Sequence, residues 1–215
     1  EFEMLEILFD SPPFVLSQLI RTTFIPSPGC RFIVADFSAI EARVIAWLAD
    51  EKWVLDVFRG HGKIYEATAA QMFRVPIETI EKGKENYHLR AKGKVATLSC
   101  GYQGGPDALI QMGALKNGLT KEELPDIVKG WRASNPHIVK LWYDAEKAAI
   151  AAVKEHRTVK LAHGVQYRYE KDFLFADLPS GRSLAYVRPE IKPDSRFDKD
   201  VLTYEGTDQI KKSWC

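Results

Sequence analysis

The sequence predicts an α+β fold, in which a helical part is inserted into a small sheet. An apolar run over residues 31–37 is typical of a short buried strand. Helical spacing of apolar residues then continues to about residue 157, and short strand patterns follow it. With 215 residues, of which 46% are hydrophobic, the chain has enough apolar side chains to bury a core.

The first helix is predicted directly after residues 31–37. Ser38 and Glu41 have the spacing of a capping box, which predicts a helix that ends at about Asp50. Three further helices are expected, over 64–73, 87–101 and 107–117. Gly118 fits the left-handed position that closes the last of these helices.

The second half of the chain is predicted to change from helices to strands. Thr120 and Glu123 form a second capping box, and the Asn135-Pro136 pair is typical of the start of a long helix that ends near residue 156. Four strands are expected after it, over 159–162, 165–169, 173–175 and 183–187.

Charge and cysteine content say little about the functional class of the protein. The chain has 30 basic and 29 acidic residues, so its net charge of +1 does not indicate a partner. Residues 1–50 carry seven acidic and three basic side chains, whereas residues 82–94 carry five basic ones and one acidic one. This asymmetry suits an anion site beside a metal site, although chance patches of this size are common. The three cysteines lack metal-ligand spacing, which favours a reduced, cytoplasmic setting.

No targeting or membrane segment is predicted. No apolar stretch reaches the roughly 18 residues of a spanning helix, so no membrane partner is expected. The start, Glu1-Phe2-Glu3-Met4, lacks the pattern of a signal peptide and the initiator Met, so we expect a piece of a longer chain.

Asp36 is the first candidate for chemistry. An Asp at the end of an apolar strand carries its carboxylate at the rim of the sheet, where it needs a cap, a salt bridge or a cation. Mg²⁺ takes one or two carboxylates together with substrate phosphate oxygens. An isolated Asp of this kind is more often structural. In the plainer interpretation Glu41 completes the capping box, and Arg43 forms a salt bridge.

Arg90, Lys94, Leu98 and Tyr102 form the second candidate, because they are spaced by four residues along one predicted helix. Each lies ~40° from the last, so they follow one slowly winding face that spans ~18 Å. The face is cationic at its start and aromatic at its end, which suits a ligand with phosphates at one end and a flat ring at the other. The alternative is a solvated basic face with Leu98 and Tyr102 in the core.

Together the two candidates resemble the motifs of family A DNA polymerases. Residues 36–43, Asp-Phe-Ser-Ala-Ile-Glu-Ala-Arg, resemble motif A, and residues 64–69 resemble a stretch that follows it in the family. Motif B, on the O helix of the fingers, is similar to Arg90, Lys94, Leu98, Tyr102 and Gly104. The order and approximate spacing agree over about residues 14–190, in the manner of the phage and prophage branch.

The resemblance implies a role for each matching residue. Asp36 would bind both catalytic Mg²⁺ ions, and the backbone carbonyl of Phe37 would be a further ligand. Glu41 would lie under the sugar and reject a 2′-hydroxyl. The remaining residues would contact the nucleotide and the template. Arg90 and Lys94 would hold the triphosphate, and Lys94 would also donate a proton to the leaving pyrophosphate. Leu98 would pack on the sugar and base, and Tyr102 would stack at the template position.

The resemblance also implies an organisation and partners. Residues 1–50 would be the palm part that carries motif A, residues 51–157 a mostly helical fingers subdomain, and residues 158–215 strands that return to a partial antiparallel-sheet palm. The implied reaction is template-directed nucleotidyl transfer from deoxynucleoside triphosphates to a primer 3′-hydroxyl. The implied partners are primer–template DNA and the rest of the polymerase, its thumb and motif C palm.

Several departures limit what the resemblance implies. The family usually has Phe or Tyr at Leu98, His at Tyr65 and Gln at Ala39, so no binding role is assigned to Tyr65 or Ala39. The His-Asp-Glu of motif C does not occur in the sequence, so we expect the chain to be inactive alone. Two alternatives stay open: a single-subunit RNA polymerase, which the proposed role of Glu41 opposes, and a non-catalytic nucleotide- or nucleic-acid-binding module.

Overall fold

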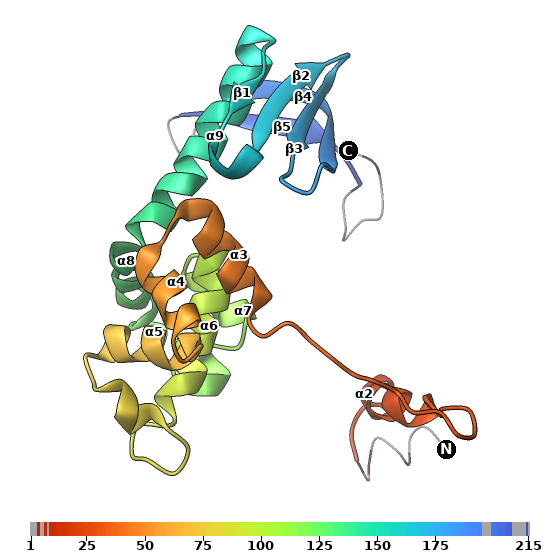
Figure 1. Cartoon of the computed structure of the whole chain (residues 1–215), viewed down its shortest axis with the longest axis vertical. Helices are drawn as coiled ribbons and strands as arrows, with labels where there is room; N and C mark the ends of the chain where they lie inside the picture. Colours follow the sequence, from red (N-terminus) through yellow and green to blue (C-terminus); the bar gives the residue numbers. More distant parts are fainter. Residues whose placement is uncertain (1–3, 5–6, 8, 195–198, 208–213, 215) are drawn as a thin grey trace. The chain divides into compact units, whose positions relative to one another are not determined.

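The structure is a computed structural model that describes residues 4, 7, 9–194, 199–207 and 214. It confirms the α+β class, with helices followed by an antiparallel sheet (Figure 1). Two compact units divide the chain, Glu1–Ser38 and Ala39–Cys215. The division into 1–50, 51–157 and 158–215 stays a prediction.

The first unit holds little regular structure among its described residues. It contains helix α2 (Pro12–Leu19), a 3₁₀ helix (Ile20–Thr23) and an irregular segment that runs to Ser38. The strand predicted over 31–37 is wrong: Ile33 and Val34 are 85% and 90% exposed, and no described strand pairs with this segment. A strand depends on a partner for its backbone hydrogen bonds, so a pattern of apolar residues alone does not create one.

The second unit begins with seven α-helices among its described residues: α3 (Ile40–Ala49), α4 (Lys52–Arg59), α5 (Ile64–Phe73), α6 (Leu89–Gly101), α7 (Pro106–Gln111), α8 (Leu124–Ser134) and α9 (Pro136–Glu155). Short 3₁₀ helices lie at Ile77–Ile80 and Leu115–Asn117. The helix predicted over 107–117 is therefore broken after Gln111, because Gly113 turns the chain with a φ of 85°. Gly118 has the expected left-handed conformation, with a φ of 79°.

The helix starts differ from the predicted capping boxes. Helix α3 begins at Ile40, with Ala39 at its N-cap position in the left-handed region, so the helix starts one residue later than a cap at Ser38 predicts. In the second box, the hydrogen bond back to the cap residue is present: the backbone N–H of Thr120 donates to the Glu123 carboxylate at 2.7 Å. Helix α8 begins directly after Glu123.

The long helix α9 begins at Pro136 as predicted, but its cap comes from elsewhere. The Asn135 amide donates to the carbonyl of Trp131 at 2.8 Å and makes no cap to α9. Instead the Glu51 carboxylate, 3% exposed, accepts the backbone N–H of His137 at 2.9 Å and of Ile138 at 3.3 Å. A carboxylate at a helix N-terminus satisfies free N–H groups and complements the helix dipole. Glu51 thereby ties the chain between α3 and α4 to α9.

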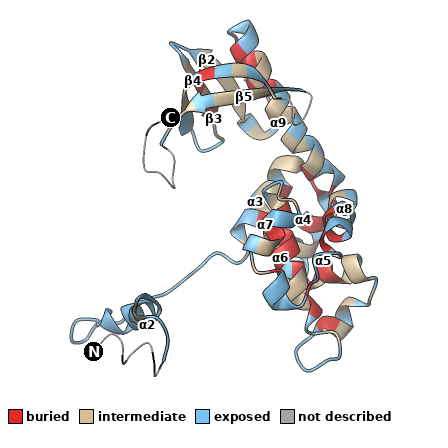
Figure 2. Ribbon diagram, turned by 180° about the vertical axis from the view of Figure 1, so that it is seen from behind, coloured by how far each residue is buried: buried red, intermediate tan, exposed pale blue. Residues whose placement is uncertain are grey.

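The main core lies among the helices, where buried residues are concentrated (Figure 2). Its centre consists of apolar side chains from α6 to α9, including Ala96, Leu109, Leu124, Trp131 and Ile138. The indole rings of Trp131 and Trp142 stack with centroids 6.0 Å apart. This core holds α6 in place, which matters because α6 carries most of the candidate site.

Five described strands follow α9: β1 (Val159–Lys160), β2 (Gln166–Glu170), β3 (Phe173–Asp177), β4 (Ser183–Asp194) and β5 (Lys199–Glu205). They pair antiparallel in chain order, with Tyr167 opposite Ala176 and Phe175 opposite Ala185. A register shift lies between Val187 and Glu190 in the pairing of β4 with β5. The sheet packs on α9 through a second core around Ala152, Val153 and Leu174 (Figure 1). The sequence pattern predicted four of these strands and missed β5.

No helix of the described residues combines the length and the apolar character that crossing a membrane requires.

Candidate functional site

Helix α6 confirms the predicted face by placing three of its four residues in successive turns. Arg90 lies near its start, Lys94 and Leu98 follow, and Tyr102 is the residue at its C-terminal cap. Lys94 is exposed and Leu98 half-buried, while Tyr102 is 69% exposed. The alternative that placed Tyr102 in the core is therefore wrong.

A close contact with α5 fixes the position of α6. A Cβ atom at Gly93 would lie 2.2 Å from the backbone carbonyl oxygen of Tyr65 and 2.9 Å from Cβ of Ala69. Only glycine allows the two backbones to approach this closely. The hydroxyl of Thr97 donates to Thr68 at 3.0 Å across the same contact. The helix face that carries Arg90 and Lys94 is thus held rigidly relative to α5.

Arg90 is held by two neighbours on α5. Its Nε donates to Oε1 of Glu66 at 2.7 Å, and its guanidinium carbon lies 5.5 Å from the centre of the Tyr65 ring. The Glu66 side chain is 14% exposed and that of Arg90 38% exposed. Lys94, one turn further along α6, has no ion-pair partner within the described ranges. The two cations therefore differ, since Arg90 is fixed and Lys94 extends into solvent.

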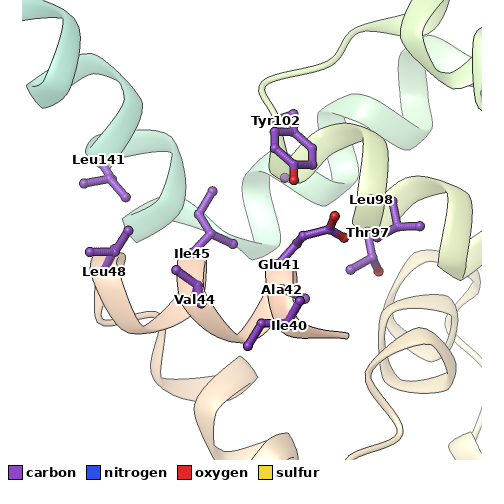
Figure 3. A pocket seen from close by; sticks show the side chains of 11 residues that line it. Ile40, Glu41, Ala42, Val44, Ile45, Leu48, Thr97, Leu98, Tyr102 and Leu141 are labelled. Atoms are coloured by element: carbon purple, nitrogen blue, oxygen red, sulfur yellow. The ribbon is translucent and has the colours of Figure 1, made fainter. Parts of the chain in front are cut away.

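An apolar pocket of about 380 Å³ lies where α3, α6 and α9 meet (Figure 3). Its lining is mostly aliphatic and includes Val44, Ile45, Leu48, Leu98 and Leu141. Glu41, Thr97 and Tyr102 are its polar members, and in Figure 3 the Tyr102 hydroxyl points toward the Glu41 carboxylate. Leu98, Tyr102 and Glu41, which come from two separate motifs, thus line one pocket.

Glu41 affects the ionisation of two tyrosines. Burial, followed by the charge of Glu41 and a hydrogen bond to it, raises the pKa of Tyr102. Burial and then the Glu41 charge also raise the pKa of Tyr65, which the positive charge of Arg90 lowers. A negative charge destabilises a nearby phenolate, which is why the Glu41 carboxylate raises the pKa of both phenols.

Arg43, the last residue of the stretch that resembles motif A, packs on an aromatic ring: its guanidinium lies 4.0 Å from the centre of the Phe58 ring.

Asp36 and Phe37 belong to the first unit, and Glu41 and the residues of α6 to the second. Both Asp36 and Phe37 are exposed, and Asp36 lies in the irregular segment instead of at the rim of a sheet. The Asp36 side chain forms no ion pair or hydrogen bond with the described residues. Within the described ranges no three His, Cys, Asp or Glu side chains converge on a common metal position.

Sequence reasoning missed Glu66 and Glu51. Glu66 lies 24 residues before Arg90, and neither spacing nor helical periodicity predicts an ion pair between two helices. Glu51 directly follows Asp50 in the sequence and caps a helix that begins more than 80 residues later. In both cases the partner depends on tertiary packing. The S-x-x-E spacing favoured Glu41 as a capping residue, whereas the structure places Glu41 in the pocket.

The comparisons with known proteins agree with this arrangement. The sequence model of DNA polymerase family A matches residues 15–163, which include the irregular segment, all of α3 to α9 and β1. The chain therefore belongs to DNA polymerase family A.

Individual relatives sharpen this assignment. The chain is 62% identical to a DNA polymerase of Bacillus phage SP02 over 205 residues, which are 95% of this chain and 31% of that protein. It is 41% identical to a DNA polymerase I of Pseudomonas aeruginosa over 61 residues, which are 28% of this chain and 7% of that protein. A DNA polymerase I A of Arabidopsis thaliana is 34% identical over 65 residues, 30% of this chain and 6% of that protein. The chain thus spans about a third of the phage relative's length.

Proposed function

We propose that this chain supplies part of the polymerase domain of an enzyme that performs template-directed DNA synthesis, as the name of its phage relative suggests. The observation that carries the proposal is the face of α6. Two cations at its start, an apolar residue and an exposed aromatic residue follow one another beside an apolar pocket. A deoxynucleoside triphosphate has this same sequence of chemical groups, from phosphates through the sugar to the base.

Arg90 and Lys94 bind the triphosphate in this proposal. Their charges oppose the phosphate charge, and positioning with charge neutralisation supplies most of the catalysis of phosphoryl transfer. Leu98 packs on the sugar and base, and Tyr102 offers its exposed ring to the template position. Lys94 Nζ, which has no ion-pair partner in the described part of the chain, donates a proton to the leaving pyrophosphate.

Glu41 selects the sugar in this proposal. Its carboxylate lines the pocket beside Leu98 and opposite the Tyr102 hydroxyl (Figure 3). A ribose hydroxyl in this space would meet the side chain, whereas a deoxyribose would not. In the polymerase that contains this chain, Glu41→Ala is expected to increase ribonucleotide incorporation at least about tenfold relative to deoxynucleotides. Primer extension with each nucleotide measures the ratio, and an unchanged ratio would favour the RNA polymerase alternative.

Asp36 is the metal ligand of the proposal. Its carboxylate is exposed and unpaired among the described residues, and carboxylate and carbonyl oxygens are the hard donors that Mg²⁺ prefers. Asp36 and the Phe37 carbonyl would hold the two ions together with ligands from the rest of the polymerase, because one carboxylate is too few. When bound, Mg²⁺ supplies activation of the primer hydroxyl and neutralisation of charge on the leaving oxygen.

The proposal includes partners and a setting. The substrates are primer–template DNA and deoxynucleoside triphosphates, and the remainder of the polymerase, with its thumb and motif C palm, completes the active site. The enzyme acts in the cytoplasm of a bacterium or of a phage-infected host, in line with the phage relative.

The direct test measures triphosphate binding by this chain. Arg90→Ala combined with Lys94→Ala is expected to weaken dATP binding by at least about tenfold, because two phosphate contacts are lost. Binding should also weaken steeply as salt concentration rises. Lys92→Ala is the matched control, because Lys92 lies on the same helix but its Nζ is 5.5 Å from the Phe73 ring centre. Equal dATP affinity in the double variant and the parent would refute the nucleotide assignment.

A further inference from the structure

The contact between α5 and α6 places a carboxylate behind the Arg90 guanidinium. Glu66 stands in the first turn of α5, where the helix dipole favours a negative charge. Its side chain is 14% exposed, so the protein covers most of it. The carboxylate is therefore not a free surface charge, and its position is set by the helix that carries it.

The ion pair with Glu66 occupies one edge of the Arg90 guanidinium and leaves the other edge open. Nε of Arg90 donates to Glu66 at 2.7 Å, and neither terminal nitrogen has a hydrogen-bond partner in the described ranges. A guanidinium has five donors in a rigid plane, so fixing the Nε edge orients the remaining N–H groups. The two terminal nitrogens stay available as a fork that matches two phosphate oxygens.

Two further contacts restrict Arg90. Its guanidinium lies over the Tyr65 ring at 5.5 Å, which limits rotation out of the plane that Glu66 sets. The backbones beneath the pair are locked because Gly93 leaves no space between α5 and α6. A long arginine side chain normally loses rotamer freedom when it binds a ligand. Here much of that ordering has taken place before a ligand arrives.

We propose that Glu66 is a positioning residue for nucleotide binding, which holds Arg90 through Nε so that its terminal nitrogens are ready for the phosphate oxygens of a deoxynucleoside triphosphate. This inference rests on the proposed function. Glu66 itself does not contact the nucleotide, and it acts only through Arg90. The opposite role, in which Glu66 neutralises Arg90 and weakens binding, makes the reverse prediction for Glu66→Ala.

The test measures dATP binding to this chain with variants at both positions. Glu66→Ala is expected to weaken binding about fivefold to tenfold, because Arg90 loses its orientation. Glu66→Gln keeps an acceptor for Nε and is expected to lose about threefold or less. Arg90→Ala is expected to lose at least as much as Glu66→Ala, and the double variant should bind like Arg90→Ala alone. The loss should be smaller for dAMP than for dATP.

Two controls separate positioning from damage to the fold. Glu78→Ala removes an exposed carboxylate from the neighbouring Ile77–Ile80 helix and is expected to leave dATP binding unchanged. Thermal unfolding of each variant shows whether a loss of affinity follows a loss of folded protein, and Glu66→Gln serves if Glu66→Ala does not fold.

The outcomes distinguish the inference from the proposed function. If Arg90→Ala weakens binding while Glu66→Ala leaves it unchanged or strengthens it, the positioning role is overturned and the nucleotide site stands. If Arg90→Ala leaves binding unchanged, both are overturned. Losses in Glu66→Ala and Arg90→Ala that add up in the double variant would also overturn the inference, because they would show that Glu66 acts independently.

Discussion

Helix α6 carries most of the stretch that resembles motif B, and the irregular segment over 31–37 carries only the start of the stretch that resembles motif A, yet the two differ in structural support. On α6, Arg90 has a fixed partner and Leu98 lines a pocket. In the irregular segment, Ile33, Val34 and Phe37 are 78–90% exposed, and Asp36 has no partner in the described part of the chain. Two stretches that are equally recognisable in the sequence can therefore differ greatly in how well their side chains are packed.

The difference follows from how the two kinds of secondary structure satisfy their backbones. A helix pairs each N–H with a carbonyl four residues earlier, so α6 needs only an apolar face and a neighbour. A strand needs another strand beside it. All described strand pairings involve residues after 158, and none reaches the segment over 31–37.

The largest expected effect lies in the exposed segment. In the polymerase that contains this chain, Asp36→Ala is expected to reduce primer extension at least about 10³-fold, because the ligand proposed for both metal ions is lost. Asp10→Ala removes another exposed carboxylate of the same unit and should leave the rate near its parental value. Gel-based extension in Mg²⁺ measures both rates. A robust rate in Asp36→Ala would show that the motif is not used as proposed.

The reactivity of the two described cysteines tests the same difference in packing between the irregular segment and α6. Cys30 is exposed in the irregular segment that runs to Ser38, whereas Cys100 is buried in α6, where burial raises its pKa to about 12. The Cys100 thiolate appears only near and above that pH, so at pH 8 about one thiol in 10⁴ is ionised. In a Cys215→Ser background, iodoacetamide is expected to label Cys30 at least about 100-fold faster. Mass spectrometry measures each rate, and denaturant should remove the difference.

Gly93 tests how tightly α6 is held. Gly93→Ala is expected to lower the free energy of unfolding by about 2–3 kcal/mol, because the new Cβ overlaps the Tyr65 carbonyl and Ala69. Gly101→Ala is the matched control on the same helix, since its Cβ would meet no atom within 4 Å. This change should stay within about 1 kcal/mol of the parent. Urea unfolding followed by circular dichroism compares them, and equal stabilities would contradict the close contact.

The smallest expected effect is a shift in the titration of Tyr102. Burial and then the Glu41 carboxylate raise the pKa of Tyr102, so Glu41→Gln is expected to lower it toward 10. The phenolate would then form at lower pH than in the parent chain. The ultraviolet difference between Tyr102→Phe and its parent, measured against pH in each background, isolates this residue. An unchanged pKa in Glu41→Gln would show that the two side chains do not interact, and a higher one would contradict the direction of the effect.

Much of the helical part could be predicted, because local signals decide it. The bounds of α5 match the predicted range, and Asn135-Pro136 correctly marks the start of α9. The face of Arg90, Lys94, Leu98 and Tyr102 follows from spacing alone. The predictions that were wrong depended on long-range partners. The strand over 31–37 lacks one among the described residues.

The site was predicted only as separate residues. Spacing and resemblance both pointed to Tyr102, and the resemblance alone pointed to Glu41, but their meeting in one pocket depends on how α3, α6 and α9 cross. Glu66 and Glu51 could not be predicted, because each contacts a helix that is distant in sequence. Carboxylates that serve another segment carry no local signature.

The order of the sheet bears on how the chain folds during synthesis. Strands β1 to β5 each pair with the next strand along the chain, so every pairing joins residues that leave the ribosome close together in time. Helix α9 precedes them and presents Ala149, Ala152 and Val153 as the surface on which they pack. Each described strand can therefore add to a support that has already been made.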